Sequence, residues 1–424
     1  MAGVAEVYLP AFGLAIGLSP VIAGLIASAP LLAGGLLQLL APRAIARASS
    51  LRGWVAGCMV VQALAFAPLL VLALVGAASA PIIMTSAAVY WVAGMGASAA
   101  WNPWMARVVP ARLRGRFFGR RQGLVQGTML LGLIGAGWAL QVTPRGQVLD
   151  VYAVLFALAM IARLISALMV AKQGKGVDAG PRRRMRFRSI PPRIRGTPRV
   201  SLLAYLVAMI AGASISGPFL TPYLLQHEQL SYGLYSIVTA AVVIAKSLAL
   251  PVWGRVLNRT SVRRVLTISA LAITPIPMMW IASDAVAWLL IVQVYAGIAW
   301  AGFDLGLLMA LFDGEDDAER TTMQAAFSAL QAVGTAGASF VGGAVLGAIG
   351  ADHTGYAAVF LVSAVARFLA CVLLVRQLPV ALAKLPFTVV TRAWTLAVRP
   401  WGGTLVRPFV EGLERLRVDR KDRE

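Results

Sequence analysis

The chain has 424 residues, of which 59% are hydrophobic and 13% charged, and its mean hydropathy is +0.79. Apolar runs of about 20 residues recur along it, which leaves little sequence for a water-soluble core. The composition therefore predicts a polytopic α-helical membrane protein. Two cysteines and two histidines are too few and too scattered for a disulfide framework or a metal site. We expect no metal and no cofactor.

The formal net charge of +21 does not require a nucleic-acid partner, because the basic clusters border apolar runs. Nearly all Lys and Arg residues outside those runs lie in alternate connections, on the same side as Arg43, Arg107 and Arg255. On the other side Arg145 stands alone. Connections rich in Lys and Arg stay in the cytoplasm. We therefore predict a multi-pass protein with both termini in the cytoplasm and no bound nucleic acid.

Hydropathy predicts twelve membrane spans, divided by a basic interval. The first six are expected at 4–18, 20–40, 53–76, 82–105, 123–142 and 148–171. The second six are expected at 201–225, 232–253, 265–283, 285–311, 325–349 and 356–375. This divides the chain into an N-terminal six-helix half (1–171), a basic cytoplasmic linker (172–200), a C-terminal six-helix half (201–377) and a basic amphipathic tail (378–424).

The linker and the tail are both rich in basic residues. The linker cannot form a packed core, and we expect it either to contact anionic lipid headgroups or to be a solvated connection whose charges set the orientation. The tail alternates apolar and basic residues, and basic residues interrupt every window of about 20 residues. We predict that it lies on the cytoplasmic membrane surface and does not span the membrane.

The two halves are related in sequence. "LSPVIAGLIASAPLLAGGLLQLLAPRAIARASSLR" from Leu18 aligns without a gap to "LSYGLYSIVTAAVVIAKSLALPVWGRVLNRTSVRR" from Leu230. "YAVLFALAMIARLISALMVAK" from Tyr152 aligns to "YAAVFLVSAVARFLACVLLVR" from Tyr356. The aligned pairs include Ser49 with Ser261, Arg52 with Arg264, and Arg163 with Arg367. Coincident arginines and tyrosines at fixed spacing indicate a duplication of six spans.

The duplication predicts that the first span is truncated at its N-terminus. The alignment places Pro10 opposite Pro222, so the first span is shorter than the seventh by about three helical turns. Either the span is genuinely short or the coding sequence starts upstream of Met1. We favour the upstream start, because a helix that begins within the bilayer leaves unpaired backbone donors in hydrocarbon.

The loop "WGRVLNRTSVRR" and the two six-span halves resemble the major facilitator superfamily of secondary transporters. Positions that fit the loop motif are Gly254, Arg259, Arg263 and Arg264, whereas Asn258 stands where the family has aspartate. The first-half copy, "APRAIARASSLR", keeps arginines, among them Arg43 and Arg47. The resemblance implies an all-α integral membrane protein of twelve transmembrane helices in two pseudo-symmetric six-helix bundles, and a monomer. It also implies that these loops gate the cytoplasmic side.

Four ionisable residues inside the predicted spans share one depth. They are Arg163, Lys246, Asp304 and Arg367, and each precedes the first charged residue of its cytoplasmic loop by the same number of positions, a rise of roughly 13 Å. Charges at this depth are costly unless paired or hydrated, which predicts an ion pair between Lys246 and Asp304 with Arg367 nearby. Because Lys246 aligns with Gly34, we expect it to be a functional specialisation.

The two arginines and Glu6 have more than one interpretation. Arg163 and Arg367 recur in both halves, so we expect structural anchors that snorkel toward the cytoplasm, with substrate binding as the alternative. Glu6 is expected near the middle of the first span, which by the resemblance lines the central cavity with the fourth, seventh and tenth. A carboxyl group there can carry a coupling proton, because burial favours its protonated form. Its alternatives are a hydrogen-bonded structural acid and a position that merely follows from the misplaced start.

Two cytoplasmic connections carry opposite charge at related positions. The connection after the fourth span is basic and includes Arg120 and Arg121, and the one after the tenth is acidic and includes Asp316 and Asp317. We hypothesise that they form a latch between the halves when the cytoplasmic side closes, with topology and solubility as the competing explanation for the charges.

These observations favour a secondary active transporter that moves a small solute by alternating access, with proton coupling as a hypothesis. A non-transporting membrane assembly or receptor protein on the same fold is the alternative, and a membrane enzyme is disfavoured. No phosphate-binding Gly-rich loop ending in Lys and Ser or Thr is present, which argues against ATP-driven transport by this chain. The predicted location is the cell membrane, a bacterial inner membrane by our interpretation. The substrate cannot be read from the sequence.

Overall fold

The computed structural model describes residues 1–38, 44–45, 47–48, 50–108, 111–173, 198–312 and 317–377. In the N-terminal part the helices are η1 (Ala2–Glu6), α1 (Leu9–Ala15), α2 (Pro20–Gln38), α4 (Leu51–Leu64), α5 (Ala67–Val75), α6 (Ala80–Val108), α7 (Ala111–Val142), η2 (Arg145–Gln147) and α8 (Val148–Lys172). In the C-terminal part they are α10 (Pro198–Ser216), η4 (Gly217–Phe219), α11 (Leu220–Pro222), η5 (Tyr223–His227), α12 (Tyr232–Arg259), α13 (Val262–Ile273), α14 (Ile276–Trp280), α15 (Val286–Phe312), α16 (Asp317–Ile349) and α17 (His353–Gln377).

The predicted spans are confirmed among the described residues. Ten helical segments, the first at Leu51–Val75 and the last at His353–Val372, are long and apolar enough to cross a membrane. Two shorter apolar helices, Gly3–Ala15 and Pro20–Gly35, occupy the positions of the first two predicted spans. Each segment overlaps one predicted span, so the chain is a multi-pass helical membrane protein. The predicted limits of the halves, linker and tail stay predictions.

Several spans are interrupted near their middle by proline. The third changes from α4 to α5 just before Pro68, and the ninth changes from α13 to α14 around Pro275 and Pro277. The seventh changes from α10 to η4 at Gly217 and Pro218. Proline has no N–H, so the carbonyl four residues earlier loses its helical partner. These interruptions leave polar backbone groups inside the bundle.

Serine caps start the third and ninth spans. The Ser50 hydroxyl accepts from the Gly53 N–H at 3.0 Å, and the Ser261 hydroxyl accepts from the Arg264 N–H at 3.3 Å. The sequence alignment pairs Ser261 with Ser49. The structure instead uses Ser50 as the cap that corresponds to Ser261, one position later than the alignment places it. Each cap satisfies one of the N–H groups that have no partner in the first turn of a helix.

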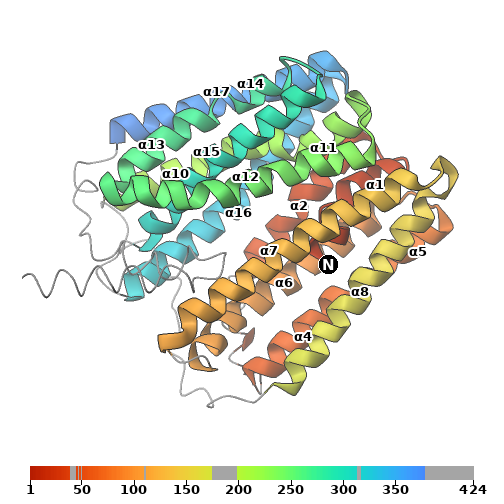
Figure 1. Ribbon diagram of the computed structural model, residues 1–424, viewed down its shortest axis with the longest axis horizontal. Coiled ribbons are helices and arrows are strands. Elements are labelled where there is room, and N and C mark those ends of the chain that lie inside the picture. The colour runs from red at the N-terminus through yellow and green to blue at the C-terminus, as the bar shows by residue number, and fades with distance from the viewer. Residues whose placement is uncertain are drawn as a thin grey trace, which may run out of the picture.

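The helices form two groups that correspond to the two halves of the sequence. In the first, α4 packs against α6 and α8, and α2 packs against α6; in the second, α10 packs against α16 and α17, and α12 against α15. Figure 1 shows the first group in the lower right and the second above it. Contacts between the groups run mainly from α2 to α16 and from α7 to α12.

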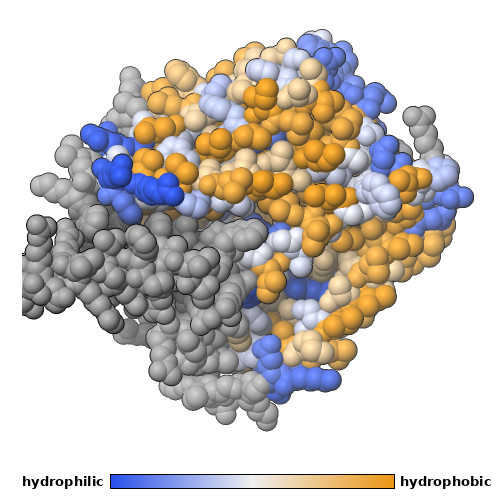
Figure 2. Space-filling view, in the orientation of Figure 1, coloured by the Kyte–Doolittle hydropathy of each residue, from blue (hydrophilic) through white to orange (hydrophobic). Residues whose placement is uncertain are grey.

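The outer helix surfaces are apolar. Large side chains such as Leu131, Trp138, Leu158 and Leu248 are more than half exposed. Figure 2 shows hydrophobic residues spread over the sides of both groups, with hydrophilic residues gathered toward the ends of the helices. An exposed apolar band of this kind suits hydrocarbon and not water.

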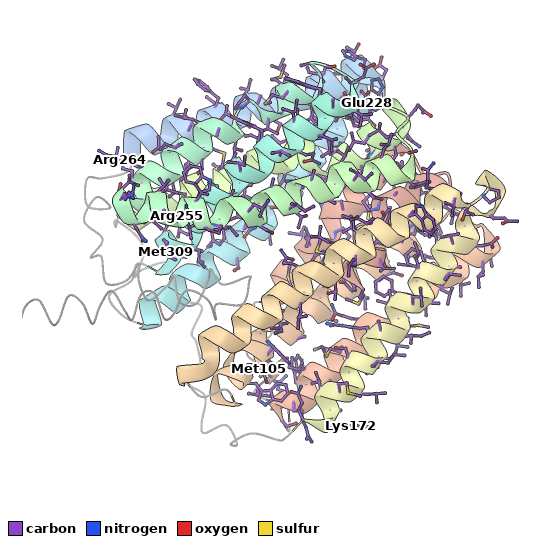
Figure 3. The ribbon with its side chains drawn as sticks, viewed as in Figure 1. Met105, Lys172, Glu228, Arg255, Arg264 and Met309 are labelled. Carbon is purple, nitrogen blue, oxygen red and sulfur yellow. The ribbon has the colours of Figure 1, made fainter. Side chains whose placement is uncertain are left out.

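The two ends of the molecule differ in how the groups meet. Lys172, Arg255 and Arg264 mark one end, which we call the basic end, and Glu228 lies at the opposite end. In Figure 3 the two groups diverge toward the basic end, so that Met105 of α6 and Met309 of α15 lie well apart.

At the opposite end the groups are joined by hydrogen bonds. The Tyr8 hydroxyl lies 2.6 Å from the Ser236 hydroxyl of α12, and the Gly233 N–H at the start of α12 donates to the Gln141 side chain of α7 at 3.2 Å. A Cβ at Gly137 of α7 would meet the Ser236 hydroxyl, so glycine is needed there for the close approach.

Candidate functional site

Lys246 of α12 and Asp304 of α15 form an ion pair through Nζ and Oδ2. The two helices approach closely because Gly297 of α15 packs on the α12 backbone, where a Cβ would lie 2.6 Å from the Val242 carbonyl oxygen. Both charged side chains are 39% exposed. Charged side chains within membrane spans normally face the bundle interior or a water-filled cavity, so their accessibility favours a position beside space that water can reach.

A second polar cluster lies in the N-terminal half. The Tyr90 hydroxyl of α6 donates to a carboxylate oxygen of Glu6 at 2.5 Å. The Gln62 amide of α4 donates to the Tyr90 carbonyl at 3.2 Å and accepts a hydrogen bond from Arg163 of α8. Gln62 and Tyr90 are 3% and 5% exposed. The cluster therefore gives a half-buried acid and a half-buried base neutral hydrogen-bond partners, Tyr90 for Glu6 and Gln62 for Arg163, which lowers the cost of taking both out of water.

Arg367 of α17 is buried in the C-terminal half, with 4% of its surface exposed. Its Nη1 donates to the Ile273 carbonyl at 3.1 Å and its Nη2 donates to the Ser216 hydroxyl at 3.3 Å. Pro277 cannot donate to the Ile273 carbonyl, so the arginine supplies the missing donor. Ser216 ends α10 at the Gly217–Pro218 interruption. The guanidinium thus sits where two interrupted spans expose backbone and hydroxyl oxygens.

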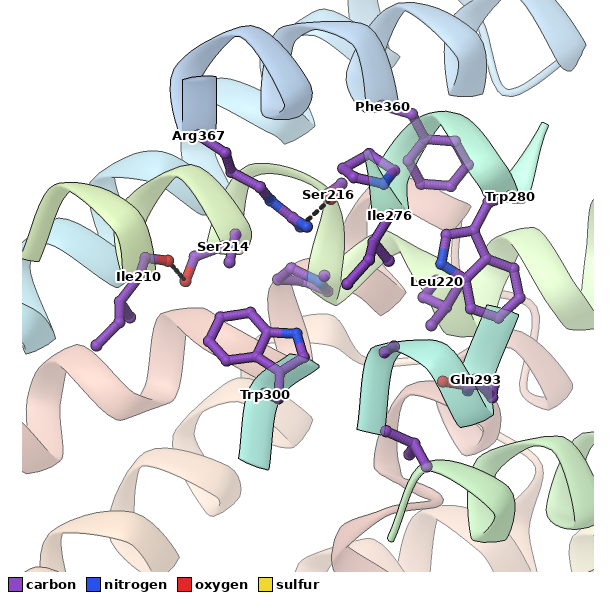
Figure 4. A pocket seen from close by; sticks show the side chains of 16 residues that line it. Ile210, Ser214, Ser216, Leu220, Ile276, Trp280, Gln293, Trp300, Phe360 and Arg367 are labelled. Carbon is purple, nitrogen blue, oxygen red and sulfur yellow. Dashed lines mark hydrogen bonds between the residues drawn. The ribbon is translucent and has the colours of Figure 1, made fainter. Parts of the chain in front are cut away.

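A cavity of about 330 Å³ opens beside this guanidinium. Its wall comes from α10, η4, α11, α12, α14, α15 and α17, and its polar side chains include Ser214, Ser216, Gln293 and Arg367. Figure 4 shows Arg367 reaching from its helix toward Ser216, with the rings of Trp280 and Trp300 on other sides of the space. A cavity of this size, mostly apolar with a few converging polar groups, is typical of a small-molecule site.

The ion pair and the cavity are neighbours along the same two helices. Val242 and Trp300 line the cavity, and each lies one helical turn before a member of the pair, Lys246 and Asp304 respectively. Arg367 lines that cavity as well, as the sequence prediction of a nearby arginine requires. The C-terminal half therefore holds a contiguous polar site built on five spans.

The predicted pairing of Lys246 with Asp304 is confirmed. The head of Arg367 is buried in the bundle, so the expected snorkelling toward the cytoplasm is wrong for this residue; buried oxygens at two interrupted spans hold it instead. Glu6 is hydrogen-bonded to Tyr90, which fits its structural interpretation and leaves the proton-carrying role a hypothesis.

The predicted loop and latch residues are described only in part. Gly254 is buried near the end of α12, Arg47, Arg259 and Arg264 are exposed, and Arg263 is half-buried. The Asn258 side-chain oxygen is buried without a hydrogen bond in the described part of the chain. Arg121 lies over the Trp101 ring, 5.4 Å from its centre. Arg43 and Asp316, and the side chains of Arg120 and Asp317, lie outside the described residues, so the gating and latch roles stay predictions.

Sequence reasoning missed the neutral partners that organise both clusters. Gln62 and Tyr90 in the N-terminal half and Ser216 and Gln293 in the C-terminal half look like ordinary polar residues within apolar runs. One available signal was proline inside a predicted span, because interrupted spans at corresponding positions of two halves point to a binding site. That signal would have drawn attention to the surroundings of Pro218 and Pro277.

Known proteins share both a family pattern and the fold. The model of the family described as Major Facilitator Superfamily matches residues 200–413. No curated protein matches the chain. The nucleoside transporter NupG superimposes with a TM-score of 0.63 at 14% identity, over 88% of this chain and 98% of that one.

Two further solved structures are similar at comparable distance. A D-xylose-proton symporter has a TM-score of 0.64 at 13% identity, over 89% of this chain and 98% of that chain. A bacterial homolog of the human lysosomal transporter Spinster, in an inward-facing and occupied conformation, has a TM-score of 0.60 at 16% identity, over 94% of each chain. At these identities the structural likeness establishes a common fold and says nothing of a common solute.

Proposed function

Because the chain belongs to the major facilitator superfamily, we propose that it is a secondary transporter that carries a small solute across the membrane by alternating access. The basic end faces the cytoplasm in this proposal, in accord with the distribution of Lys and Arg. Both termini are then cytoplasmic, the membrane is the plasma membrane of the cell, and the protein acts as a monomer without enzymatic chemistry.

One observation carries the proposal. The two halves are hydrogen-bonded together at the end opposite the basic one, through Tyr8 with Ser236 and Gln141 with Gly233. They diverge at the basic end. The partly exposed pair of Lys246 and Asp304 lies within the lengths of α12 (Tyr232–Arg259) and α15 (Val286–Phe312), away from the ends of both helices. Alternating access needs a site that opens to one side while the other side is closed. This arrangement fits the inward-open member of such a cycle.

Proton coupling is proposed at Asp304. Its carboxylate is accessible and paired with Lys246, so a proton arriving on Asp304 would cancel its charge and release the pair. Glu6 is the second candidate, since its carboxylate is held by Tyr90 inside the N-terminal half. The two candidates differ in access, because Asp304 faces water-reachable space in this conformation.

The test begins with purified protein and a panel of small solutes, scored by thermal stabilisation at two pH values. A stabilising solute is then offered to liposomes containing the protein, with and without a proton gradient. We expect uptake or exchange that saturates with solute. A solute that binds but never crosses, in protein that is folded and correctly inserted, would contradict transport and favour a receptor.

Charge variants test the coupling. Asp304→Asn is expected to abolish the response to the proton gradient while solute exchange without a gradient continues. Glu6→Gln is the matched comparison in the other half, and loss of gradient dependence there instead would assign the proton to Glu6. If neither variant alters gradient dependence, the coupling proposal is wrong.

A further inference from the structure

The charge of Arg367 has no carboxylate partner in the described part of the chain. The ion pairs there join Lys246 to Asp304 and His227 to Glu228. Within the described part of the chain, Arg367 donates to a backbone carbonyl and a serine hydroxyl, and its Nε is buried there without a hydrogen bond. A guanidinium stays charged in proteins, and a buried charge without a counter-charge is costly. The site is therefore electrostatically incomplete.

A second group in the same cavity is also without a partner. Gln293 of α15 is 5% exposed, and its amide has no hydrogen bond within the described residues. An amide at the wall of a cavity can hydrogen-bond a polar group of a molecule held there. Gln293 and Arg367 come from different spans and border one space, as Figure 4 shows.

From this geometry we infer that the cavity binds an organic monocarboxylate, with Arg367 as the counter-charge of the carboxylate. This inference rests on the proposed transport function and names the substrate class for it. The Arg367 guanidinium, steadied by Ile273 and Ser216, holds the anionic end of the solute. Gln293 hydrogen-bonds a second polar group, and the indole rings of Trp280 and Trp300 cover the apolar body.

The charge balance selects one negative charge. Lys246 and Asp304 already neutralise each other next to the cavity, so Arg367 is the cation left without a partner among the described cavity residues. A monocarboxylate makes the site neutral, whereas a dianion would leave a buried negative charge. The planar fork of a guanidinium also matches the two oxygens of a carboxylate.

The size and lining of the cavity limit the rest of the solute. A space of about 330 Å³ lies at the small end of ligand sites. Most of its wall is apolar, with Ile210, Leu220, Ile276 and Phe360 beside the two tryptophans. We therefore expect a compact aromatic or aliphatic body and not a polyhydroxylated one.

Matched pairs of probes separate charge from shape. Benzoate, phenylacetate and hexanoate are compared with their uncharged amides, and with phenyl phosphate as the dianion. Binding is measured on purified full-length protein by isothermal titration and thermal stabilisation, so the result does not depend on transport. We expect at least one carboxylate to bind about tenfold or more tightly than its amide and than phenyl phosphate.

Variants assign the charge to Arg367. Arg367→Gln should weaken carboxylate binding by about ten- to hundredfold and leave amide binding unchanged, while Arg367→Lys should recover part of the loss. Lys172→Gln removes one positive charge from the exposed end of α8 and should change nothing. Ala213→Leu, which grows from a half-buried cavity wall into the space, should block binding without touching the arginine.

Failure of the inference is distinct from failure of the transport proposal. If a neutral or cationic solute binds and is transported, with Arg367→Gln as active as the unaltered protein, the carboxylate inference is overturned and transport stands. If carboxylates bind through Arg367 but no solute crosses the membrane, the site stands and transport falls. Equal weakening by Arg367→Gln and Lys172→Gln would mean that bulk charge, not this site, attracts the anion.

Discussion

The two halves place an arginine at the same point of their last spans but surround it differently. Arg163 donates to the side-chain amide of Gln62, whereas Arg367 donates to the backbone carbonyl of Ile273. Gln62 and Ile273 lie equally far beyond the serines that cap α4 and α13. Both arginines therefore reach the third helix of their half at one level, through a side chain in one case and the main chain in the other.

The acids are distributed differently as well. In the N-terminal half Glu6 belongs to the same hydrogen-bonded cluster as Arg163, joined through Tyr90 and Gln62. In the C-terminal half Asp304 pairs with Lys246, and Arg367 has no carboxylate partner among the described residues. Both halves thus have the arginine, and among the described residues only the N-terminal one shares a polar cluster with an acid. We expect the N-terminal cluster, which contains both an acid and a base, to stabilise the fold. We expect the C-terminal site, where Arg367 has no carboxylate partner among the described residues, to bind the solute.

The largest effect is expected when a disulfide joins the two halves covalently at the end opposite the basic one, because transport should then stop. A Cβ on Gly233 would lie 3.7 Å from the Cβ of Gln141, a separation that suits a disulfide. With Cys58 and Cys371 replaced by serine, the pair Gln141→Cys and Gly233→Cys should cross-link and abolish transport until reductant is added. Transport that continues through the cross-linked form would show that the halves need not separate at this end.

A matched pair at the basic end controls for chance collisions. Met105→Cys and Met309→Cys lie on diverging helices of the two halves, and both positions are buried within their own half, so they should not cross-link in this conformation. Efficient cross-linking there and none at the opposite end would reverse our view of which side is closed.

Loss of the Tyr90 hydroxyl from the N-terminal cluster should lower the stability of the protein. Tyr90→Phe removes a hydrogen bond to the Glu6 carboxylate and should lower the free energy of unfolding by about 1.5–3 kcal/mol. Tyr205→Phe in the C-terminal half is the control, because the Tyr205 hydroxyl is buried with no partner among the described residues and its removal should cost nothing. Unfolding in detergent measures both, and equal losses would refute the cluster's special role.

The coupling energy between Lys246 and Asp304 should be smaller than that of a buried ion pair. Lys246→Met and Asp304→Asn each leave one charge unpaired, but both side chains are 39% exposed and the remaining charge can be hydrated. A double-mutant cycle should give a coupling energy of about 1 kcal/mol, with the double variant more stable than the sum of the single losses implies. Strictly additive losses would mean that the contact contributes nothing to stability.

The smallest expected effect is the loss of stability when the capping serines Ser50 and Ser261 are replaced. Ser50→Ala and Ser261→Ala each remove a side-chain acceptor from the first turn of a helix and should cost about 0.5–1 kcal/mol. Serine-to-threonine variants at the same positions keep the hydroxyl and should be close to neutral. A large loss in one half alone would show that the two starts are not structurally equivalent.

The positions of the spans could be predicted closely because apolar length is a local property. Each predicted span overlaps one apolar helical segment, and the Lys246 and Asp304 pairing followed from their shared depth in spans that need internal neutralisation. The one-residue shift between Ser50 and the aligned Ser49 could not be predicted. Either serine can cap a helix, and only the helix that actually forms selects one of them.

The sequence alone determined the membrane class, the order of the apolar spans and the position of each interior charge along its span, because these depend on composition and on distance along a helix. The tertiary structure alone decided which neutral groups meet those charges. Arg163 and Arg367 are equivalent in the repeat, yet the surrounding helices bring Gln62 to one and an uncapped carbonyl to the other. Such partners lie more than ninety positions apart in the chain, so packing between helices, and no local pattern, sets them.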